Sequence, residues 1–190
     1  SCRKPADCAI MRDQHKIHSI CIDYEDEASI IKGFADALEF TDGHLDALFN
    51  NGAYGIPALV EDLPTAALRA IFEANFFGWH TLSRLAIAQM RQQKQGRIIQ
   101  NSSVLGFAPL KFRGAYNATK FALEGLTDTM RLELHGTNIH LILVEPGPIR
   151  TRIRENAYMQ FKQWINWKGT ARESWYEEIA IPRLSAINPP

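Results

Sequence analysis

The stretch RIIQNSSVLGFAPLKFRGAYNATK, residues 97–120, carries the pattern that decides the fold. It begins with an apolar run that turns polar by Ser103, as expected where a strand reaches the mouth of a parallel sheet. It ends with Tyr116 and Lys120, which are four residues apart and therefore share one face of a helix. The stretch predicts a strand, a loop and a helix that bring Ser103 and Tyr116 to one site.

A phenol beside an ammonium group is a proton donor with a tunable pKa. The free phenol has a pKa of about 10, and a positive charge within about 4–6 Å favours the phenolate. Lowering the pKa of Tyr116 to about 7 takes roughly 4 kcal/mol, which we assign to Lys120 together with a second nearby positive charge. The alternative is a surface contact between residues one helical turn apart.

Two more apolar strands end in turns of a similar kind. Residues 45–49 precede the turn Asn50-Asn51-Gly52-Ala53, and residues 139–144 precede Pro146-Gly147-Pro148. Open parallel sheets bind ligands beyond the carboxyl ends of their strands. We therefore expect both turns to line one crevice together with Ser103.

Strands and helices alternate along the chain. Strands are expected at residues 16–22, 46–50, 96–102 and 138–144, and helices at residues 5–11, 26–40, within 64–93, 116–135 and 157–167. This alternation predicts a single α/β domain over residues 1–190, with a parallel sheet and helices on both faces. Residues 152–190 are rich in aromatic side chains, which indicates either a helix packed on the core or a lid over an apolar substrate pocket.

Composition excludes several classes of protein. The 190 residues carry a formal net charge of zero with scattered basic residues, so no nucleic-acid partner is expected. Cys2, Cys8 and Cys21 lack metal-ligand spacing and indicate the reduced thiols of a cytoplasmic protein, with no metal site. No apolar run approaches about 18 residues, and no signal peptide precedes the first element, so no membrane span is expected.

The chain resembles the short-chain dehydrogenase/reductase family through an ordered set of motifs over residues 1–155. They are Asp23, the turn at residues 50–53, Asn75, Ser103, Tyr116 with Lys120, and Pro146-Gly147 with Thr151. The segments NNGAYG and EPGPIRT are similar to those of bacterial NADP-dependent aldehyde reductases and, through them, of retinol and 17β-hydroxysteroid dehydrogenases. The resemblance implies a Rossmann-type, doubly wound parallel sheet.

The resemblance also implies a strand, a Gly-rich turn and a helix before Ser1, where the chain opens as the exit of a strand. In the family that unit holds the cofactor pyrophosphate at a helix N-terminus. The 12 glycines of this chain form no G-x-G-x-x-G motif. We therefore expect the fold without its first strand–helix unit and, because residues 187–190 form no strand pattern, without its last strand.

Four residues are expected to carry the chemistry. The resemblance implies that Tyr116 is the general acid for carbonyl reduction and the base for the reverse reaction. It implies that Lys120 stabilises the phenolate and bonds the nicotinamide ribose, and that Asn75 holds a water linking Lys120 to solvent. Ser103 is expected to donate a hydrogen bond to the carbonyl oxygen, where charge develops. Ser103 is otherwise an ordinary turn residue.

Cofactor choice depends on Arg3 and Lys4. In the family a basic residue after the second strand meets the 2′-phosphate of NADP, and an arginine fork suits phosphate, so NADP(H) is expected over NAD(H). Asp23 is expected to accept a hydrogen bond from the adenine amino group, or else to cap the next helix. The remaining cofactor contacts are expected at Asn50, Gly52, Tyr116, Lys120, Pro146, Gly147, Ile149 and Thr151. Gly52-Ala53 reverses the family's Ala-Gly order, so Gly52 supplies backbone freedom one residue early.

The expected function is hydride transfer between a nicotinamide and an apolar aldehyde or ketone, or the corresponding alcohol. Apolar residues between Ser103 and Tyr116 suggest this substrate: Gly106, Phe107, Leu110 and Phe112. A charged substrate would instead need Lys111 or Arg113. The alternatives are a non-catalytic NADP-binding sensor, and an epimerase or dehydratase, which usually has a larger C-terminal domain. A homodimer or homotetramer through the Asn75 and Tyr116 helices is implied by the resemblance.

Overall fold

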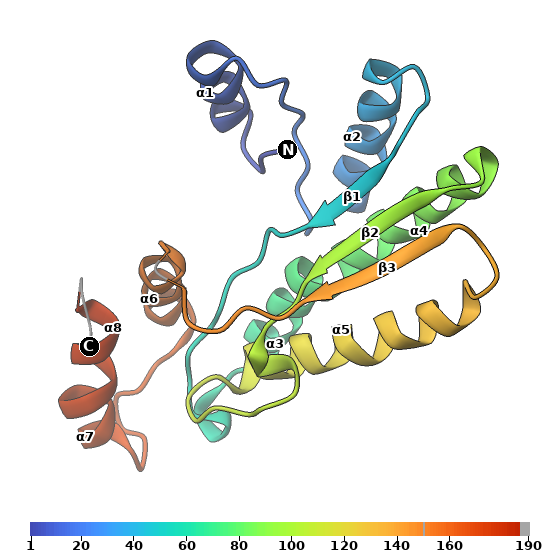
Figure 1. Cartoon of the computed structure of the whole chain (residues 1–190). Helices are drawn as coiled ribbons and strands as arrows, with labels where there is room; N and C mark the ends of the chain where they lie inside the picture. Colours follow the sequence, from blue (N-terminus) through green and yellow to red (C-terminus); the bar gives the residue numbers. More distant parts are fainter. Residues whose placement is uncertain (150, 187–190) are drawn as a thin grey trace.

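The computed structural model describes residues 1–149 and 151–186, and its sheet has three parallel strands. The strands are β1 (Ala47–Asn50), β2 (Gly96–Asn101) and β3 (Ile139–Val144), in the order β1-β2-β3 (Figure 1). The register aligns Leu48 with Ile98 and Ile98 with Leu141. The predicted parallel α/β fold is confirmed, while the expectation for residues 187–190 lies outside the described residues.

Helices α2 (Glu27–Phe40), α4 (Gly78–Gln93) and α5 (Gly114–Glu133) cover one face of this sheet. Their apolar residues enclose the inward side chains of the strands: Phe34, Ala86, Met90 and Met130 pack around Ile98 and Leu141. On the opposite face Phe49, Ile142 and Val144 remain exposed. In the described part of the chain, the second layer of helices expected from the sequence does not cover these three residues.

The expected long helix is continuous but contains a π turn. Helix α3 (Thr65–Phe72) runs into the π segment η2 (Glu73–Phe77) and then into α4. A π turn accommodates one extra residue in a helix and is frequent at functional sites. Asn75 lies in this turn and is fully buried.

The strand expected at residues 16–22 is wrong. This segment forms only an isolated bridge between Cys21 and Cys2, in which Cys2 N–H donates to Ile20 O and Ile22 N–H donates to Cys2 O. A strand needs a partner backbone along its length, and among the described residues only Cys2 bridges to this segment. Helix α1 (Pro5–His15) precedes it and ends four residues later than expected.

The strand at β1 is also less buried than expected. Its side chains alternate, so that Asn50 is buried while Phe49 is 52% exposed. This pattern follows from a sheet whose helices lie on one face.

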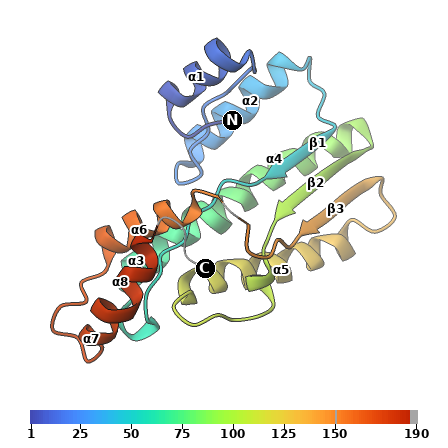
Figure 2. The ribbon, with the colours of Figure 1, turned by 60° about the vertical axis from the view of Figure 1, so that its left-hand side comes forward.

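The C-terminal segment forms a second core at the carboxyl end of the sheet (Figures 1 and 2). It contains α6 (Ile153–Trp164), α7 (Glu173–Trp175), the π segment η4 (Tyr176–Ala180) and α8 (Ile181–Ser185). Phe161 and Tyr176 are fully buried against Ile71 and Ala115. The Tyr176 hydroxyl accepts from Leu59 N–H at 3.1 Å and donates to Asp62 at 2.9 Å. Of the two interpretations of these aromatics, packing on the core is therefore confirmed, and the role of a lid stays a prediction.

Two short 3₁₀ turns complete the described elements: η1 (Val60–Asp62) and η3 (Val104–Gly106). No helix in residues 1–149 or 151–186 combines the length and the apolar character needed to cross a bilayer.

Candidate active site

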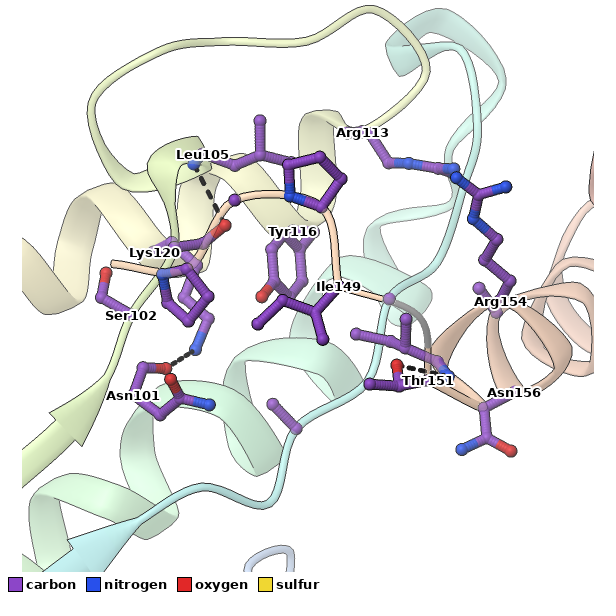
Figure 3. A pocket seen from close by; sticks show the side chains of 18 of the residues that line it. Asn101, Ser102, Leu105, Arg113, Tyr116, Lys120, Ile149, Thr151, Arg154 and Asn156 are labelled. Carbon is purple, nitrogen blue, oxygen red and sulfur yellow. Dashed lines mark hydrogen bonds between the residues drawn. The ribbon is translucent and has the colours of Figure 1, made fainter. Parts of the chain in front are cut away.

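A cavity of about 550 Å³ opens at the carboxyl ends of β2 and β3 (Figure 3). Its wall includes most of the predicted catalytic and nicotinamide-facing residues: Ser103, Tyr116, Lys120, Pro146, Gly147, Ile149 and Thr151. The loop after β3 is tied to the loop after β2 because Val104 N–H donates to Pro146 O at 3.1 Å. The predicted crevice is therefore present, and Ser103 and Tyr116 line the same space.

A second cavity, of about 690 Å³, adjoins the first. Asn51, Ala53 and Asn156 line both. The second cavity also collects three of the predicted cofactor contacts: Arg3 and Asp23, which were expected at the adenosine end, and Gly52. The two cavities together form an elongated site.

Tyr116 lies in the first turn of α5 and faces the first cavity. Burial raises the pKa of its phenol, and hydrogen bonding from the Ser103 hydroxyl partly opposes that shift. Ser103 is fixed in turn, because its Oγ accepts from Leu105 N–H at 3.1 Å. Tyr116 therefore keeps its proton at neutral pH.

Lys120 is only 1% exposed, and its ammonium is held by the protein. Its Nζ donates to Asn101 O at 2.7 Å and lies 4.3 Å from the ring centroid of Trp79 and 5.5 Å from that of Tyr116. Burial lowers the pKa of Lys120 to about 7, and the charge of Glu124 opposes this shift.

The predicted lowering of the Tyr116 pKa by Lys120 is wrong for this structure. Burial dominates the pKa of both groups and disfavours each charged form. The ammonium lies over the ring of Tyr116 and donates to Asn101.

Trp79 is a site residue that sequence reasoning did not single out. It is fully buried, its Nε1–H donates to Gly52 O at 3.0 Å, and its ring faces the ammonium of Lys120. A cation over an indole face is stabilised by about 0.5–2 kcal/mol. The sequence shows Trp79 only as one apolar residue among many on a long helix, so no signal distinguishes it there.

Glu124 follows Lys120 by one helical turn and receives a short hydrogen bond from the Ser102 hydroxyl. Gly106 makes room for this contact, since a Cβ at Gly106 would lie 2.9 Å from the Glu124 side chain. The carboxylate is thereby fixed near the lysine whose charge it supports.

Asn75 supports a loop and does not line the first cavity. Its Oδ1 accepts from Tyr54 N–H at 3.1 Å, and its Nδ2 donates to Tyr54 O at 2.8 Å and to Thr119 Oγ1 at 3.4 Å. Both donors of the amide are therefore used by the protein. The water-holding role remains a prediction.

Asn50 does not reach either cavity, contrary to its predicted cofactor contact. Its Nδ2 donates to Ser83 Oγ at 3.1 Å and to Gln100 Oε1 at 3.0 Å, beneath α4. Successive side chains of a strand point to opposite faces, so the next residue, Asn51, lines the cavities.

At the adenosine end, the role of Asp23 as a helix cap is wrong. Asp26 caps α2 by accepting from Ala28 and Ser29 N–H groups, whereas the Asp23 carboxylate accepts from Glu25 N–H at 3.0 Å. Asp23 thus remains on the cavity wall.

Gly52 allows a close contact with the side chain of Tyr24. A Cβ at Gly52 would lie 2.8 Å from the ring of Tyr24. The glycine therefore permits close approach of Tyr24, and not the unusual backbone path that the NNGA order suggested.

The predicted apolar wall is only partly correct. Leu110 lines the cavity, together with Leu105. Phe107 is 59% exposed, and Phe112 packs instead against Phe161 and Trp175. None of the described residues forms a cluster of His, Cys, Asp and Glu suited to a metal ion, and the three cysteines are free.

The chain is similar in sequence to a known protein family and to individual members of it. The profile described as short chain dehydrogenase matches residues 4–161. The chain is 37% identical over 155 residues to the uncharacterized oxidoreductase YbbO of Escherichia coli K12, covering 82% of this chain and 57% of YbbO. It is 33% identical over 150 residues to human retinol dehydrogenase 8, covering 78% of this chain and 48% of that protein.

A solved structure shows the same relationship in three dimensions. A short-chain dehydrogenase from Streptomyces avermitilis superposes with a TM-score of 0.73 at 30% identity, covering 80% of this chain and 57% of that one. The chain spans about half the length of the curated relatives it matches.

Proposed function

The chain belongs to the short-chain dehydrogenase family, and on that premise we propose that it is an NADP(H)-dependent oxidoreductase. It transfers a hydride between the nicotinamide and an apolar aldehyde or ketone, or the corresponding alcohol. One observation carries this proposal: Ser103, Tyr116 and Lys120 share a cavity that adjoins a second cavity with Arg3 at its edge.

The three residues divide the proton chemistry. When bound, the dinucleotide supplies or accepts the hydride. Tyr116, whose burial keeps its phenol protonated, donates the proton to the carbonyl oxygen and removes it in the reverse direction. Ser103 donates a hydrogen bond to the same oxygen as charge develops there. Lys120 supplies positive charge behind the phenol and a donor for the cofactor ribose.

Residues at both ends of the elongated site fit a dinucleotide phosphate. Arg3 and Lys4 lie on the second cavity and offer cations for a 2′-phosphate. Asp23 and Gly52 line the adenosine end, with Asn51 in the place expected for Asn50. At the nicotinamide end the loop after β3 supplies Pro146, Gly147, Ile149 and Thr151. The chain contributes no Gly-rich cradle for the pyrophosphate.

The first cavity favours an apolar substrate. Leu105, Leu110, Ile149 and Ile153 contribute to its wall. We assign to residues 152–186 the role of a cover over both cavities. Helix α6 lines the first cavity with Ala157 and the second with Met159 and Gln160. Its aromatic side chains anchor this cover in the second core.

Assembly into a homodimer or homotetramer belongs to the same proposal. Helix α5 exposes Phe121 and Leu132, and a shared helical face would remove such apolar groups from water. The free cysteines are compatible with work in the cytoplasm. Sedimentation of the wild-type protein and of Phe121→Glu measures the assembly, and a monomeric wild type would contradict it.

The proposed activity is tested by following NADPH absorbance with a panel of apolar aldehydes. Tyr116→Phe should lower turnover by about 10²–10⁴-fold, because it removes the proton donor. Tyr158→Phe, on α6, is the matched control and should keep wild-type turnover. Turnover that survives Tyr116→Phe would remove Tyr116 from this role. Binding of NADPH without any turnover in the wild type would instead support the sensor alternative.

A further inference from the structure

Two arginines meet at the outer part of the first cavity. Arg113 precedes α5, and Arg154 lies in the first turn of α6. Figure 3 shows their guanidinium groups pointing toward one another across the mouth of the cavity. The two side chains come from distant parts of the sequence, so the docking of α6 creates this pair.

Within the described residues, these cations lack acceptors. The Nη1 of Arg113 is shielded from solvent and has no hydrogen-bond partner. No carboxylate in the described parts of the chain forms an ion pair with Arg113 or Arg154, whereas nearby Arg152 pairs with Glu155 at 3.0 Å. The contrast shows that acidic partners are available in this segment but are not used for the pair.

The pair is electrostatically unfavourable by itself. Burial and the charge of Arg154 both lower the pKa of Arg113. A guanidinium nevertheless stays protonated in proteins, so an anion bound between the two arginines would offset this unfavourable contact. Two planar forks that face the same space suit a carboxylate, which each can contact through parallel hydrogen bonds.

We propose that Arg113 and Arg154 bind a carboxylate carried by the substrate at the end remote from its reacting carbonyl. The inference rests on the proposed function for the position of that carbonyl beside Tyr116. It names the substrate class as aldehydes or ketones with an apolar chain that ends in a carboxylate.

The placement of the groups suits such a molecule. Arg113 is the N-cap residue of α5, three residues before Tyr116, and both side chains line the first cavity. Leu105, Leu110 and Ile153 line the cavity beside them. A substrate can thus place its carbonyl at Tyr116, its chain against these side chains, and its carboxylate between the arginines. The carboxylate takes no part in the hydride or proton transfer.

Binding without turnover is the first test. Calorimetry would compare octanoate with octanamide, which has the same chain without the charge, on the wild-type protein, Arg154→Gln and Lys162→Gln. We expect octanoate to bind at least tenfold more tightly than octanamide. Arg154→Gln should abolish this preference, and Lys162→Gln, which removes an exposed cation of α6 that lines neither cavity, should preserve it. Equal affinities in the wild type, or the same loss in both variants, would overturn the proposal.

Measurements of turnover distinguish failure of the carboxylate site from failure of the proposed oxidoreductase function. The measured quantity is the ratio of kcat/KM for a straight-chain aldehyde acid to that for octanal, at equal chain length. A ratio above ten that falls at least tenfold in Arg154→Gln supports the carboxylate site. Reduction of octanal with no preference for the acid overturns the site and leaves the proposed function intact. Preference for octanoate in calorimetry with neither aldehyde reduced supports the site and overturns the function.

Discussion

Lys120 and Arg113 lie on either side of Tyr116 in the chain, Lys120 one turn after it on α5 and Arg113 at the N-cap of α5, and their surroundings differ. Lys120 donates to Asn101 O, lies over Trp79 and has Glu124 nearby. Arg113 has a shielded nitrogen without a partner in the described parts of the chain, and it faces Arg154.

The protein itself holds the ammonium of Lys120 in place, whereas it leaves the guanidinium of Arg113 available to a ligand. A buried charge is costly unless the fold supplies acceptors or a ligand does. At Lys120 the fold supplies them, so the position of the ammonium is fixed before any substrate binds. At Arg113 it does not, which is the basis for the carboxylate site.

The largest effect should come from removing the partnered cation. Lys120→Met deletes the charge behind Tyr116 and should lower kcat by about a hundredfold or more. Steady-state NADPH oxidation with an apolar aldehyde measures this loss. Lys162→Met, on α6, is the control and should keep its turnover. Activity that persists in Lys120→Met would show that Tyr116 works without its neighbour.

Stability should depend on pH through the same lysine. Burial lowers the pKa of Lys120 to about 7 in the folded protein, whereas an unfolded lysine has a pKa of about 10.4. Between these values the unfolded state binds more protons, so the free energy of unfolding should rise with pH. The expected rise is on the order of 1–4 kcal/mol.

Urea unfolding between neutral and alkaline pH measures that rise. Lys120→Met should flatten it, while Lys32→Met, which removes an exposed lysine, should leave it in place. A free energy of unfolding that falls over this range in the wild type would reverse the assignment.

A smaller effect should come from the carboxylate that supports Lys120. Glu124→Gln removes a charge that raises the Lys120 pKa. The alkaline limb of the kcat/KM profile should therefore move to lower pH by roughly one unit. Glu133→Gln, at the exposed end of α5, is the control, and an unmoved limb in Glu124→Gln would exclude Glu124 as the electrostatic support.

The smallest effect should come from removing the unpartnered cation. Arg113→Met should leave the free energy of unfolding unchanged or raise it by up to about 1 kcal/mol, because it removes a poorly satisfied charge. Arg131→Met, which loses a hydrogen bond to Leu141 O, should instead destabilise by about 0.5–1.5 kcal/mol. Urea unfolding at neutral pH compares the two, and a loss above about 2 kcal/mol in Arg113→Met would reveal a structural role.

Much of the fold could be predicted because its signals are local. Apolar strands followed by polar turns predicted the parallel sheet, and the four-residue spacing placed Tyr116 and Lys120 on one helix face. The order of the motifs predicted that Ser103 and Pro146 share one crevice, and both line the first cavity. The expected strand at residues 16–22 failed because a strand depends on its neighbours, which local pattern does not specify.

The remaining site features depend on packing across the chain. Asn50 is structural and Asn51 faces the cavities because of which side of β1 packs against the helices. The alternation of side chains along a strand does not by itself show which of these two residues points to the helices. Arg154 reaches Arg113 only because the aromatics of the C-terminal segment dock α6 beside the cavity. Trp79 has the apolar character of any core residue until its neighbour Lys120 is known.

The π turn at Glu73–Phe77 holds one residue more than a regular helix needs. The loss of one codon within this turn can therefore be absorbed by its conversion to a regular α-helix, so that α3 and α4 keep the faces they present. A regular α-helix advances about 100° per residue, so a codon lost elsewhere in α3 or α4 would rotate the residues on one side of it by about that angle. For this helix the position of a one-residue deletion decides whether Trp79 stays against the ammonium of Lys120.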